Sequence, residues 1–563
     1  MPDTREYLPA TPTPKKDEMI FIPLGGCEQF GINMNLYGHD GRWLLVDLGI
    51  GFGDETMPGV DLLLPDPDFI SDRANKLDGL IVTHAHEDHV GGVAHLWDEL
   101  GCPIYATALT IEFLKRKFEE DGGDRQPEFV VMQPGERYQI GNFEVEPVEM
   151  AHSVPQCAAM IIRTAAGTVV HTADWKLDDE PLTGWRTNMD RLGEVGEEGV
   201  LAIVGDSTNA GEPGYAGSEK TSKEALTGLI GKLKNRIVVT CFSSNVARVM
   251  SVIEAAKANG RDVAIVGRSL KRMLDCAVES GVIEKMPTLV PDREAGAIPR
   301  DKIVYICTGT QGEPRAALSR LSRDDHPFLA LEQGDNVIYS SRDIPGNQRA
   351  IGWVKNQLIG MGVNVITPDD VPGIHVSGHG SSEDLTQVYQ LLKPQIVVPV
   401  HGETANLHAH AELAAKLQIP TVIEPENGTA IRLAETRPEI VGQVLTGILT
   451  VDGDRIGRLD DGAVVNRRRL SYAGVISVSV AIDTRGELLA DPKVEMSGVA
   501  SDDDEDELIP ELVDAIEKAI INLPRPRRAD DGHCHEAARL AVRRRVKKLF
   551  DKKPVIHVAV MRV

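Results

Sequence analysis

The sequence is poor in aromatic residues, in cysteine and in positive charge. Phe, Trp and Tyr make up 4% of the 563 residues, so extended stacking on nucleic-acid bases would contribute little to any recognition. The seven cysteines are dispersed and never form a Cys-x-x-Cys pair, which favours reduced thiols in a cytoplasm over a disulfide framework or a thiolate zinc site. The net charge of −25 does not exclude an anionic partner, because a metal site can reverse the sign locally.

Long apolar runs are missing as well. No stretch approaches the roughly 18 apolar residues that a membrane span needs. Residues 1–18 are polar and rich in proline, with no apolar segment of the kind found in signal peptides. We therefore expect a flexible N-terminal arm over 1–18 and a cytoplasmic protein with no membrane association.

The rest of the chain is too long for one hydrophobic core and divides by pattern. Short strands with tight turns fill 19–210, and helices alternate with strands over 211–368, which is typical of parallel α/β structure. Buried strands resume over 369–450, a linker is expected at 451–468, and 469–563 predicts a small C-terminal α+β domain.

The segment "THAHEDH" follows an apolar run and contains His84, His86, Asp88 and His89. Imidazole nitrogens and carboxylate oxygens are the ligands that zinc, manganese and similar divalent ions accept. A strand end can direct His84 and His86 to one ion, while Asp88 and His89 point to a second. The alternative is a surface histidine cluster in a loop.

Further candidate ligands follow later strands: His152 in "MAHSVP", Asp174 in "HTADWK" and His401 in "VVPVHGE". Any one of them alone is more often a structural residue than a ligand. Together with the first cluster they make seven ligands, the number that two ions need when a carboxylate and a hydroxide bridge them.

With these motifs the sequence resembles the metallo-β-lactamase superfamily, whose fold is an αββα sandwich. The resemblance implies that His84, His86 and His152 hold one ion, that Asp88, His89 and His401 hold the other, and that Asp174 bridges them. It also implies that Asp47, in "LLVDLG", orients a ligand without binding metal.

The long interval between Asp174 and His401 resembles the β-CASP branch, which inserts a parallel α/β domain there and cleaves phosphodiesters. That branch adds a catalytic acid and a histidine, matched by Asp206 in "IVGDSTNA" and His379 in "HVSGHGSSED". Segments such as "PLGGCEQFGINMNLY", "TCFSSNVARV" and "CTGTQGEPRAALSR" are similar to the ribonuclease J family, from about residue 19 to 480. Gln156 stands where that family usually has an acid, and Trp175 where it usually has Phe.

Two loops have the composition of phosphate sites. Small residues let backbone N–H groups approach an anion, and the helix that follows presents its positive N-terminus. The resemblance assigns both loops to RNA: Ser243, Ser244 and Asn245 in one, and His375, Val376, Ser377, Gly378 and His379 in the other. Plain helix caps are the alternative. Arg248, Arg268 and Arg342 lie nearby in sequence and could line the same channel, or could be surface charges.

The resemblance implies a processive 5′→3′ exoribonuclease that uses hydroxide bound by two metals, prefers single-stranded RNA with a 5′-monophosphate and has some endonuclease activity. The expected roles are RNA decay and ribosomal-RNA maturation. The cofactors would be two divalent ions, zinc first, with manganese or magnesium as alternatives. A structural calcium ion could also bind near Asp452, and the alternative is that this segment is a plain turn without a ligand.

The expected partners are a second copy of the chain, as a homodimer or homotetramer, and RNA-decay proteins such as a helicase or other ribonucleases. Three alternatives stay open: a DNA-processing β-CASP nuclease, a catalytically silent RNA-binding scaffold and a small-molecule hydrolase. The segment "GHCHE" at 532–536 looks like a metal clip, but no second pair is visible, so we interpret it as a helix start.

Overall fold

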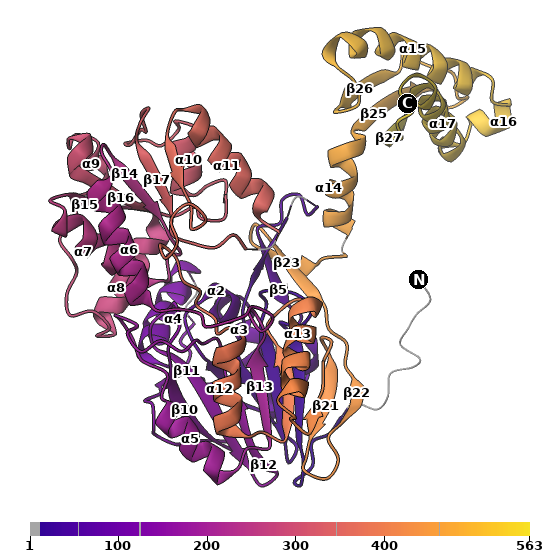
Figure 1. The fold of residues 1–563 in the computed structure, drawn as a ribbon. Helices are drawn as coiled ribbons and strands as arrows, with labels where there is room; N and C mark the ends of the chain where they lie inside the picture. Colours follow the sequence, from indigo (N-terminus) through magenta and orange to yellow (C-terminus); the bar gives the residue numbers. More distant parts are fainter. Residues whose placement is uncertain (1–11, 55, 123–124, 345, 461) are drawn as a thin grey trace. The chain divides into compact units, whose positions relative to one another are not determined.

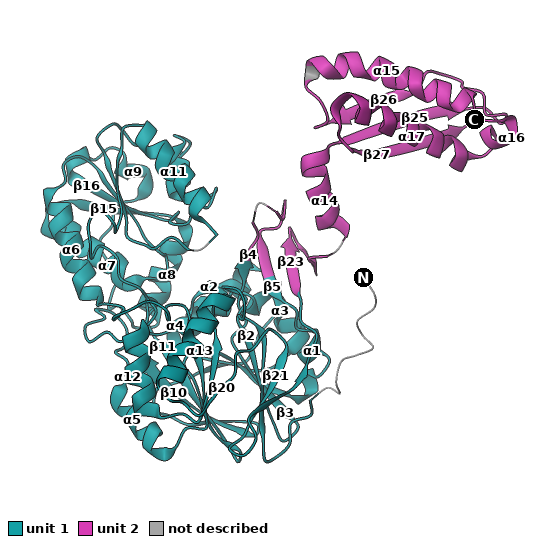
Figure 2. Ribbon diagram, turned by 45° about the vertical axis from the view of Figure 1, so that its right-hand side comes forward, with its two compact units in different colours: residues 1–51, 64–447 teal, residues 52–63, 448–563 magenta. Residues whose placement is uncertain are grey.

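The computed structural model describes residues 12–54, 56–122, 125–344, 346–460 and 462–563. The chain forms two compact units, residues 1–51 with 64–447 and residues 52–63 with 448–563 (Figure 2). Most of the predicted N-terminal arm lies outside the described residues. Within its described part, the carbonyl groups of Pro14 and Lys15 accept hydrogen bonds from the backbone of Gly41 and Asp40.

Two sheets form a sandwich in the first unit (Figure 1). The eight-stranded sheet contains, in order, β22 (Glu439–Gln443), β21 (Thr429–Leu433), β1 (Met19–Gly25), β2 (Met34–His39), β3 (Arg42–Val46), β6 (Leu77–Val82), β7 (Ile104–Ala106) and β8 (Phe129–Val131). The seven-stranded sheet contains β20 (Thr421–Val422), β19 (Ile396–Val400), β13 (Ala202–Asp206), β12 (Gly167–His171), β11 (Cys157–Thr164), β10 (Phe143–Met150) and β9 (Tyr138–Ile140).

Strand β11 shows why these sheets stack. Its side chains alternate between two faces, as the period of a strand requires. Met160 and Ile162 join the core between the two sheets, together with Phe21 and Tyr37 of the opposite sheet. Ile161 points the other way, into a second core. Helices cover that outer face: α5 (Met189–Glu198), α12 (Ser382–Leu392) and α13 (Thr404–Lys416).

An inserted lobe extends from α6 to β18, and we call the rest of the first unit the sandwich lobe. The five strands of the inserted lobe are all parallel, in the order β15 (Asp262–Val266), β16 (Ile303–Cys307), β14 (Ile237–Thr240), β17 (Asn336–Tyr339) and β18 (Asn364–Ile366). Its longer helices are α6 (Glu219–Lys232), α7 (Val246–Ala258), α8 (Arg268–Glu279) and α11 (Gln348–Gly360). The chain leaves the seven-stranded sheet after β13 and re-enters it at β19, the parallel neighbour of β13.

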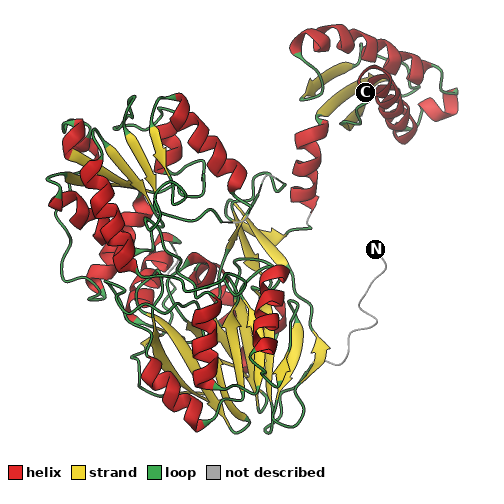
Figure 3. Cartoon of the chain, viewed as in Figure 1, coloured by secondary structure: helices red, strands yellow, loops and turns green. Residues whose placement is uncertain are grey.

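The second unit has a three-stranded sheet, β26 (Lys493–Ser497), β25 (Val475–Ile482) and β27 (Val555–Arg562), with α15 (Asp502–Ile521) and α17 (Asp531–Phe550) packed on it (Figure 3). Its apolar core includes Val478, Leu512 and Val542. The expected linker at 451–468 contains β24 (Arg455–Arg458) and the start of α14 (Gly462–Ala473). The segment "GHCHE" lies in the first turns of α17, so its interpretation as a helix start is confirmed.

The described helices include none that is both long and apolar enough to cross a bilayer. All seven cysteines are buried free thiols. Burial raises the pKa of Cys102 and of Cys241 to about 12, which keeps these thiols protonated and unreactive at neutral pH.

Candidate active site

The candidate site lies where strands of both sheets end at one edge of the sandwich. Strands β12, β13 and β19 are parallel neighbours, so their carboxyl ends meet. His379 lies in the loop before α12, and every other candidate lies at or after a strand end: Asp47 after β3, His84–His89 after β6, His152 after β10, Asp174 after β12, Asp206 at the end of β13 and His401 after β19. Residues far apart in sequence therefore converge through the topology of the sheets.

The first group of candidate ligands contains His84, His86, His152 and Asp174, whose ligand atoms all lie within 4.8 Å of one another. Nδ1 of His86 lies 3.0 Å from Nε2 of His152 and 3.2 Å from Nε2 of His84. Burial lowers the pKa of His86 to about 4 and that of His84 and His152 well below the usual range. Neutral imidazoles with converging nitrogens are the form that binds a metal ion.

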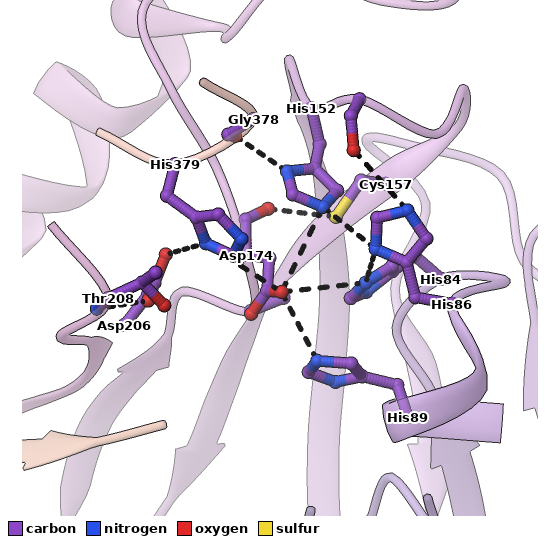
Figure 4. Close-up of polar contacts among 12 residues, drawn as sticks. His84, His86, His89, His152, Cys157, Asp174, Asp206, Thr208, Gly378 and His379 are labelled. Carbon is purple, nitrogen blue, oxygen red and sulfur yellow. Dashed lines mark hydrogen bonds and ion pairs between the residues drawn. The ribbon is translucent and has the colours of Figure 1, made fainter. Parts of the chain in front are cut away.

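The second group contains Asp88, His89 and His401, and again Asp174. Oδ2 of Asp174 lies 3.2 Å from Nε2 of His89 and 3.4 Å from Nε2 of His401. The same oxygen lies 3.7 Å from Nε2 of His84 in the first group. Asp174 is thus the one residue shared by both groups, and Figure 4 shows imidazole rings directed toward it.

Hydrogen bonds fix the orientation of several of these rings. Nδ1 of His89 donates to Oδ2 of Asp47 over 2.7 Å, and Nδ1 of His152 donates to the carbonyl oxygen of Gly378 over 2.7 Å. Asp47 also accepts from the backbone N–H and the hydroxyl of Thr83. Such partners leave each Nε2 free to face the centre, which is how proteins orient metal-binding histidines.

Asn33 belongs to this arrangement and was not identified from the sequence. Its side chain is buried, its Oδ1 accepts from Nδ1 of His401 over 3.0 Å, and its Nδ2 donates to the carbonyl of Asp88 over 2.9 Å. The available signal was a polar residue directly before β2, whose six residues are all buried.

The carboxylates and imidazoles of the cluster shift one another's pKa values. Burial opposes the ionised form of Asp174, but the imidazoles of His401 and His89 hold its pKa well below the usual range. Burial also opposes the charge on His89, and the carboxylates of Asp174, Asp88 and Asp47 raise its pKa well above normal. Imidazoles packed around one buried carboxylate form a donor set that is compatible with divalent metal binding.

Asp206 and His379 form a pair beside the two ligand groups (Figure 4). Nδ1 of His379 donates to Oδ2 of Asp206 over 2.7 Å, and Oδ1 of Asp206 accepts from the backbone of Thr208 over 2.9 Å. Burial disfavours the charged imidazole, but Asp206 and Asp174 outweigh it and raise the pKa of His379 to about 9. The His379 ring stacks on that of His401 at 5.7 Å.

A series of buried hydrogen bonds supports the strand end that carries Asp206. The hydroxyl of Ser207 lies 2.8 Å from Nδ1 of His410, and the hydroxyl of Tyr389 bonds to Nε2 of the same ring. All three are buried: Ser207 directly follows β13, His410 lies in α13 and Tyr389 lies in α12. These are the elements next to Asp206, His401 and His379, so these hydrogen bonds join the supports of the site.

The loop 375–379 lies against the first ligand group. Its five residues are half-buried. A Cβ at Gly378 would stand 2.9 Å from Oγ of Ser153 and 3.1 Å from Cε1 of His152, so a side chain there would displace one of these two residues. Oγ of Ser377 accepts from Nδ2 of Asn209 over 2.7 Å. Helix α12, which follows, is capped by its own Ser381 and Asp384.

In the loop 243–245, Ser243 and Ser244 are half-buried and Asn245 caps α7. The expectation that Arg248 lines a channel is wrong: its side chain is completely buried and forms an ion pair with Glu219. Arg342 is exposed and lies near Asn209 and Glu212, which its guanidinium contacts at 3.1 and 3.0 Å.

Comparison with known proteins agrees with the fold. Residues 28–239 match the metallo-beta-lactamase superfamily, and residues 371–425 match the Zn-dependent metallo-hydrolase RNA specificity domain. The sandwich lobe is therefore a metallo-β-lactamase fold. Residues 234–358 match the ribonuclease J beta-CASP domain, and residues 462–563 match the ribonuclease J C-terminal domain.

Curated relatives cover nearly the whole chain. It is 44% identical over 553 residues to a protein named ribonuclease J from Sinorhizobium meliloti, with 97% of this chain and 98% of that protein aligned. A ribonuclease J from Thermus thermophilus is 36% identical over 82% of each chain. A solved structure of a protein of unknown function from Enterococcus faecalis V583 shares the fold, with a TM-score of 0.52 and 18% identity over 74% of this chain and all of that one.

The chain belongs to the ribonuclease J family, a family of metal-dependent ribonucleases. The predicted family, fold class and enzyme class are confirmed: a metallo-β-lactamase sandwich with an inserted β-CASP domain and a small C-terminal α+β domain, in a hydrolase that depends on metal.

Proposed function

We propose that this chain is a 5′→3′ exoribonuclease that prefers RNA with a 5′-monophosphate and also cuts internally. The observation that supports this most directly is the sharing of Asp174 between two groups of metal-binding side chains, with the Asp206–His379 pair beside them. RNA decay and ribosomal-RNA maturation in the cytoplasm are the roles that follow.

Two divalent ions would fit the residues present: His84, His86 and His152 would hold one, Asp88, His89 and His401 would hold the other, and Asp174 belongs to both groups. When bound, such ions supply an ionised water at neutral pH and neutralise the charge that develops on a phosphate. Zinc suits the imidazole-rich donor set best, and manganese or magnesium is the alternative.

The residues of the chain perform the remaining steps. His379, kept protonated by Asp206, donates a proton to the leaving 3′-oxygen, and Asp206 holds the imidazole in that orientation. The loops 243–245 and 375–379 bind the backbone phosphates and the 5′ end. Because aromatic residues are few, recognition depends on phosphate and not on base identity.

Calcium receives no support from the geometry around Asp452. The Arg467 guanidinium contacts both oxygens of that carboxylate, Oδ1 at 3.1 Å, and so takes the place of a cation. The homodimer or homotetramer and the RNA-decay partners remain predictions.

Three 3′-labelled substrates test the proposal: an RNA with a 5′-monophosphate, the same RNA with a 5′-triphosphate, and a single-stranded DNA of the same sequence. We expect mononucleotides from the monophosphate RNA, slower release from the triphosphate and little from DNA. Equal rates on both RNA ends would contradict the 5′-end preference. Faster cleavage of DNA would favour a DNA-processing enzyme, and no cleavage with zinc, manganese or magnesium would favour a silent scaffold.

A further inference from the structure

Four charged side chains lie buried together outside the ligand groups: Lys176, Asp178, Glu219 and Arg248. Their side chains are 0, 0, 1 and 0% exposed. Nζ of Lys176 lies 3.1 Å from Oδ2 of Asp178 and 3.8 Å from Oε1 of Glu219. Two positive and two negative groups make the cluster neutral as a whole, so each charge has a partner in a place that water does not reach.

The cluster joins the sandwich lobe to the inserted lobe. Lys176 and Asp178 follow the candidate ligand Asp174 in the same segment of the sandwich lobe. Glu219 opens α6, the first helix of the inserted lobe, and its backbone N–H donates to Oδ2 of Asp178 over 2.9 Å. Nζ of Lys176 donates to the carbonyl of Gly217 at the entry to that lobe, over 3.0 Å.

Arg248 extends the cluster to both candidate phosphate loops. Its Nη2 lies 3.0 Å from both carboxylate oxygens of Glu219. Its backbone N–H donates to Oδ1 of Asn245 over 2.8 Å, in the first loop. Its Nη1 lies 3.3 Å from the carbonyl oxygen of Ile374 and 3.4 Å from Nδ1 of His375, at the start of the second loop.

Additional bonds close this connection. Nη1 of Arg248 also donates to Oγ of Ser340 over 2.6 Å, and that hydroxyl donates to the Ile374 carbonyl over 2.6 Å. Nδ2 of Asn245 lies 3.4 Å from Oε1 of Glu219. Both loops are therefore attached to one ion pair: 243–245 through the carboxylate of Glu219 and the backbone of Arg248, and 375–379 through the guanidinium of Arg248.

A buried ion pair is not the most stable way to fill such a space, because apolar residues of similar volume avoid the desolvation cost. A guanidinium donates hydrogen bonds to a carboxylate in fixed directions. Such a pair therefore fixes the relative position of its two residues, which an apolar contact does not. The Arg248–Glu219 pair has that form, and its hydrogen bonds reach Asn245 in one loop and His375 in the other, while Glu219 also contacts the segment of Asp174 through Asp178.

We propose that Arg248 and Glu219 are positioning residues that hold the loops 243–245 and 375–379 at a fixed spacing relative to each other and to the segment of Asp174. Recognition of a 5′-phosphorylated end then depends on this pair, although neither side chain touches the RNA. The inference rests on the proposed function for its substrate, and on the contacts of Arg248 for its geometry.

The test is the double variant Arg248→Met with Glu219→Gln, which leaves the Lys176–Asp178 pair neutral. Its matched control is Arg236→Met with Asp335→Asn, which removes another buried pair of the inserted lobe, 3.0 Å apart and joining residues at the starts of β14 and β17. Metal content, the kinetics on 5′-monophosphate and 5′-hydroxyl RNA, and amide hydrogen exchange of both loops are measured for all three proteins.

We expect the double variant to raise KM for 5′-monophosphate RNA about tenfold with kcat nearly unchanged, within the range by which supporting residues modulate ligand coupling. Its preference over 5′-hydroxyl RNA falls by the same factor, and hydrogen exchange accelerates in both loops together. The control changes neither property, and metal content is the same in all three.

Unchanged exchange in both loops, or an increase in the control of equal size, would overturn the inference. If the unaltered protein shows no preference for 5′-monophosphate RNA, the proposed function fails, while the exchange data still decide whether the pair positions the loops. Should the double variant not fold, Arg248→Lys takes the same measurements: it keeps the charge but lacks the fork, so we expect faster exchange in both loops, and normal exchange would contradict the inference.

Discussion

Three stretches of this chain place histidines two residues apart, and two of them, His84 with His86 and His533 with His535, have different fates. In the first unit both imidazoles turn toward Asp174 and the strand ends around it. In the second unit the His533 side chain is 52% exposed and pairs with Asp530 in the first turn of α17. The residue between His533 and His535 is Cys534, which packs into the apolar core.

The difference teaches that histidine spacing alone does not make a metal site. A helix start separates the side chains of neighbouring residues around its axis, and its polar groups are satisfied by capping. Parallel strands that end at one edge instead bring side chains from distant segments together. The first pair has such partners, and among the described residues of the second unit no group of three candidate ligands was found around the second pair.

The largest effect is expected when one histidine of each pair is replaced. Metal ions supply several kcal/mol of transition-state stabilisation, so we expect His86→Ala to lower kcat/KM for RNA roughly 1,000-fold and to reduce bound metal. His535→Ala is the control and leaves both unchanged. Elemental analysis and a ribonuclease assay measure the two effects, and an active, fully metallated His86→Ala protein would contradict the assignment.

Asp206→Asn separates acid–base chemistry from metal binding inside the first unit. General acid–base catalysis contributes typically 10²–10⁴-fold, so we expect kcat to fall about 100-fold or more while metal content is retained. Asp98→Asn, at an exposed carboxylate, is the control. Loss of metal from Asp206→Asn would show that this carboxylate binds an ion itself.

Chelation distinguishes the two units without any substitution. A metal that binds only the folded state stabilises it by about 2.7 kcal/mol when its free concentration is 100 times Kd. We expect a chelator to lower the free energy of unfolding of the first unit by about this amount and to leave the second unit as it was. Hydrogen exchange resolved by segment follows both, and equal destabilisation of the two units would contradict a site confined to the first.

Asn33→Ala probes the support of His401 and Asp88. Loss of an outer-shell partner typically costs 10–100-fold in metal affinity, so we expect a decrease of about tenfold or more in competition with a chelator. Asn142→Ala, at an exposed site, should leave the affinity unaltered. An unchanged affinity in Asn33→Ala would mean that the histidine is oriented by other contacts.

The smallest effect is expected in the second unit. Asp530 accepts a hydrogen bond from the backbone of His533 and caps α17. Replacing a cap by alanine costs about 1 kcal/mol, so Asp530→Ala should lower the stability of this unit by about that amount, measured by urea unfolding. Metal content and activity should not change, and a loss of metal would indicate a second metal site.

The sequence predicted the candidate ligands because each one comes after an apolar strand, and hydrophobic patterns predict where strands end. It did not predict Asn33, whose partners Asp88 and His401 are distant in the chain. Arg248 was misjudged for a related reason: its closeness to the loop 243–245 was visible, but its ion pair with Glu219 was not. Residues 451–468 have the polar, glycine-containing composition of a linker, yet they include β24 and the start of α14.

The order of the strands has a consequence for protein synthesis. Strand β19 lies between β13 and β20, and β21 pairs with β1, although both are translated long after the rest of the sandwich. Since chains emerge from the ribosome N-terminus first, a nascent polypeptide lacks β19 and His401 until translation has passed the whole inserted lobe. Premature termination anywhere before that point releases a product that lacks β19 and His401 and therefore cannot complete the seven-stranded sheet.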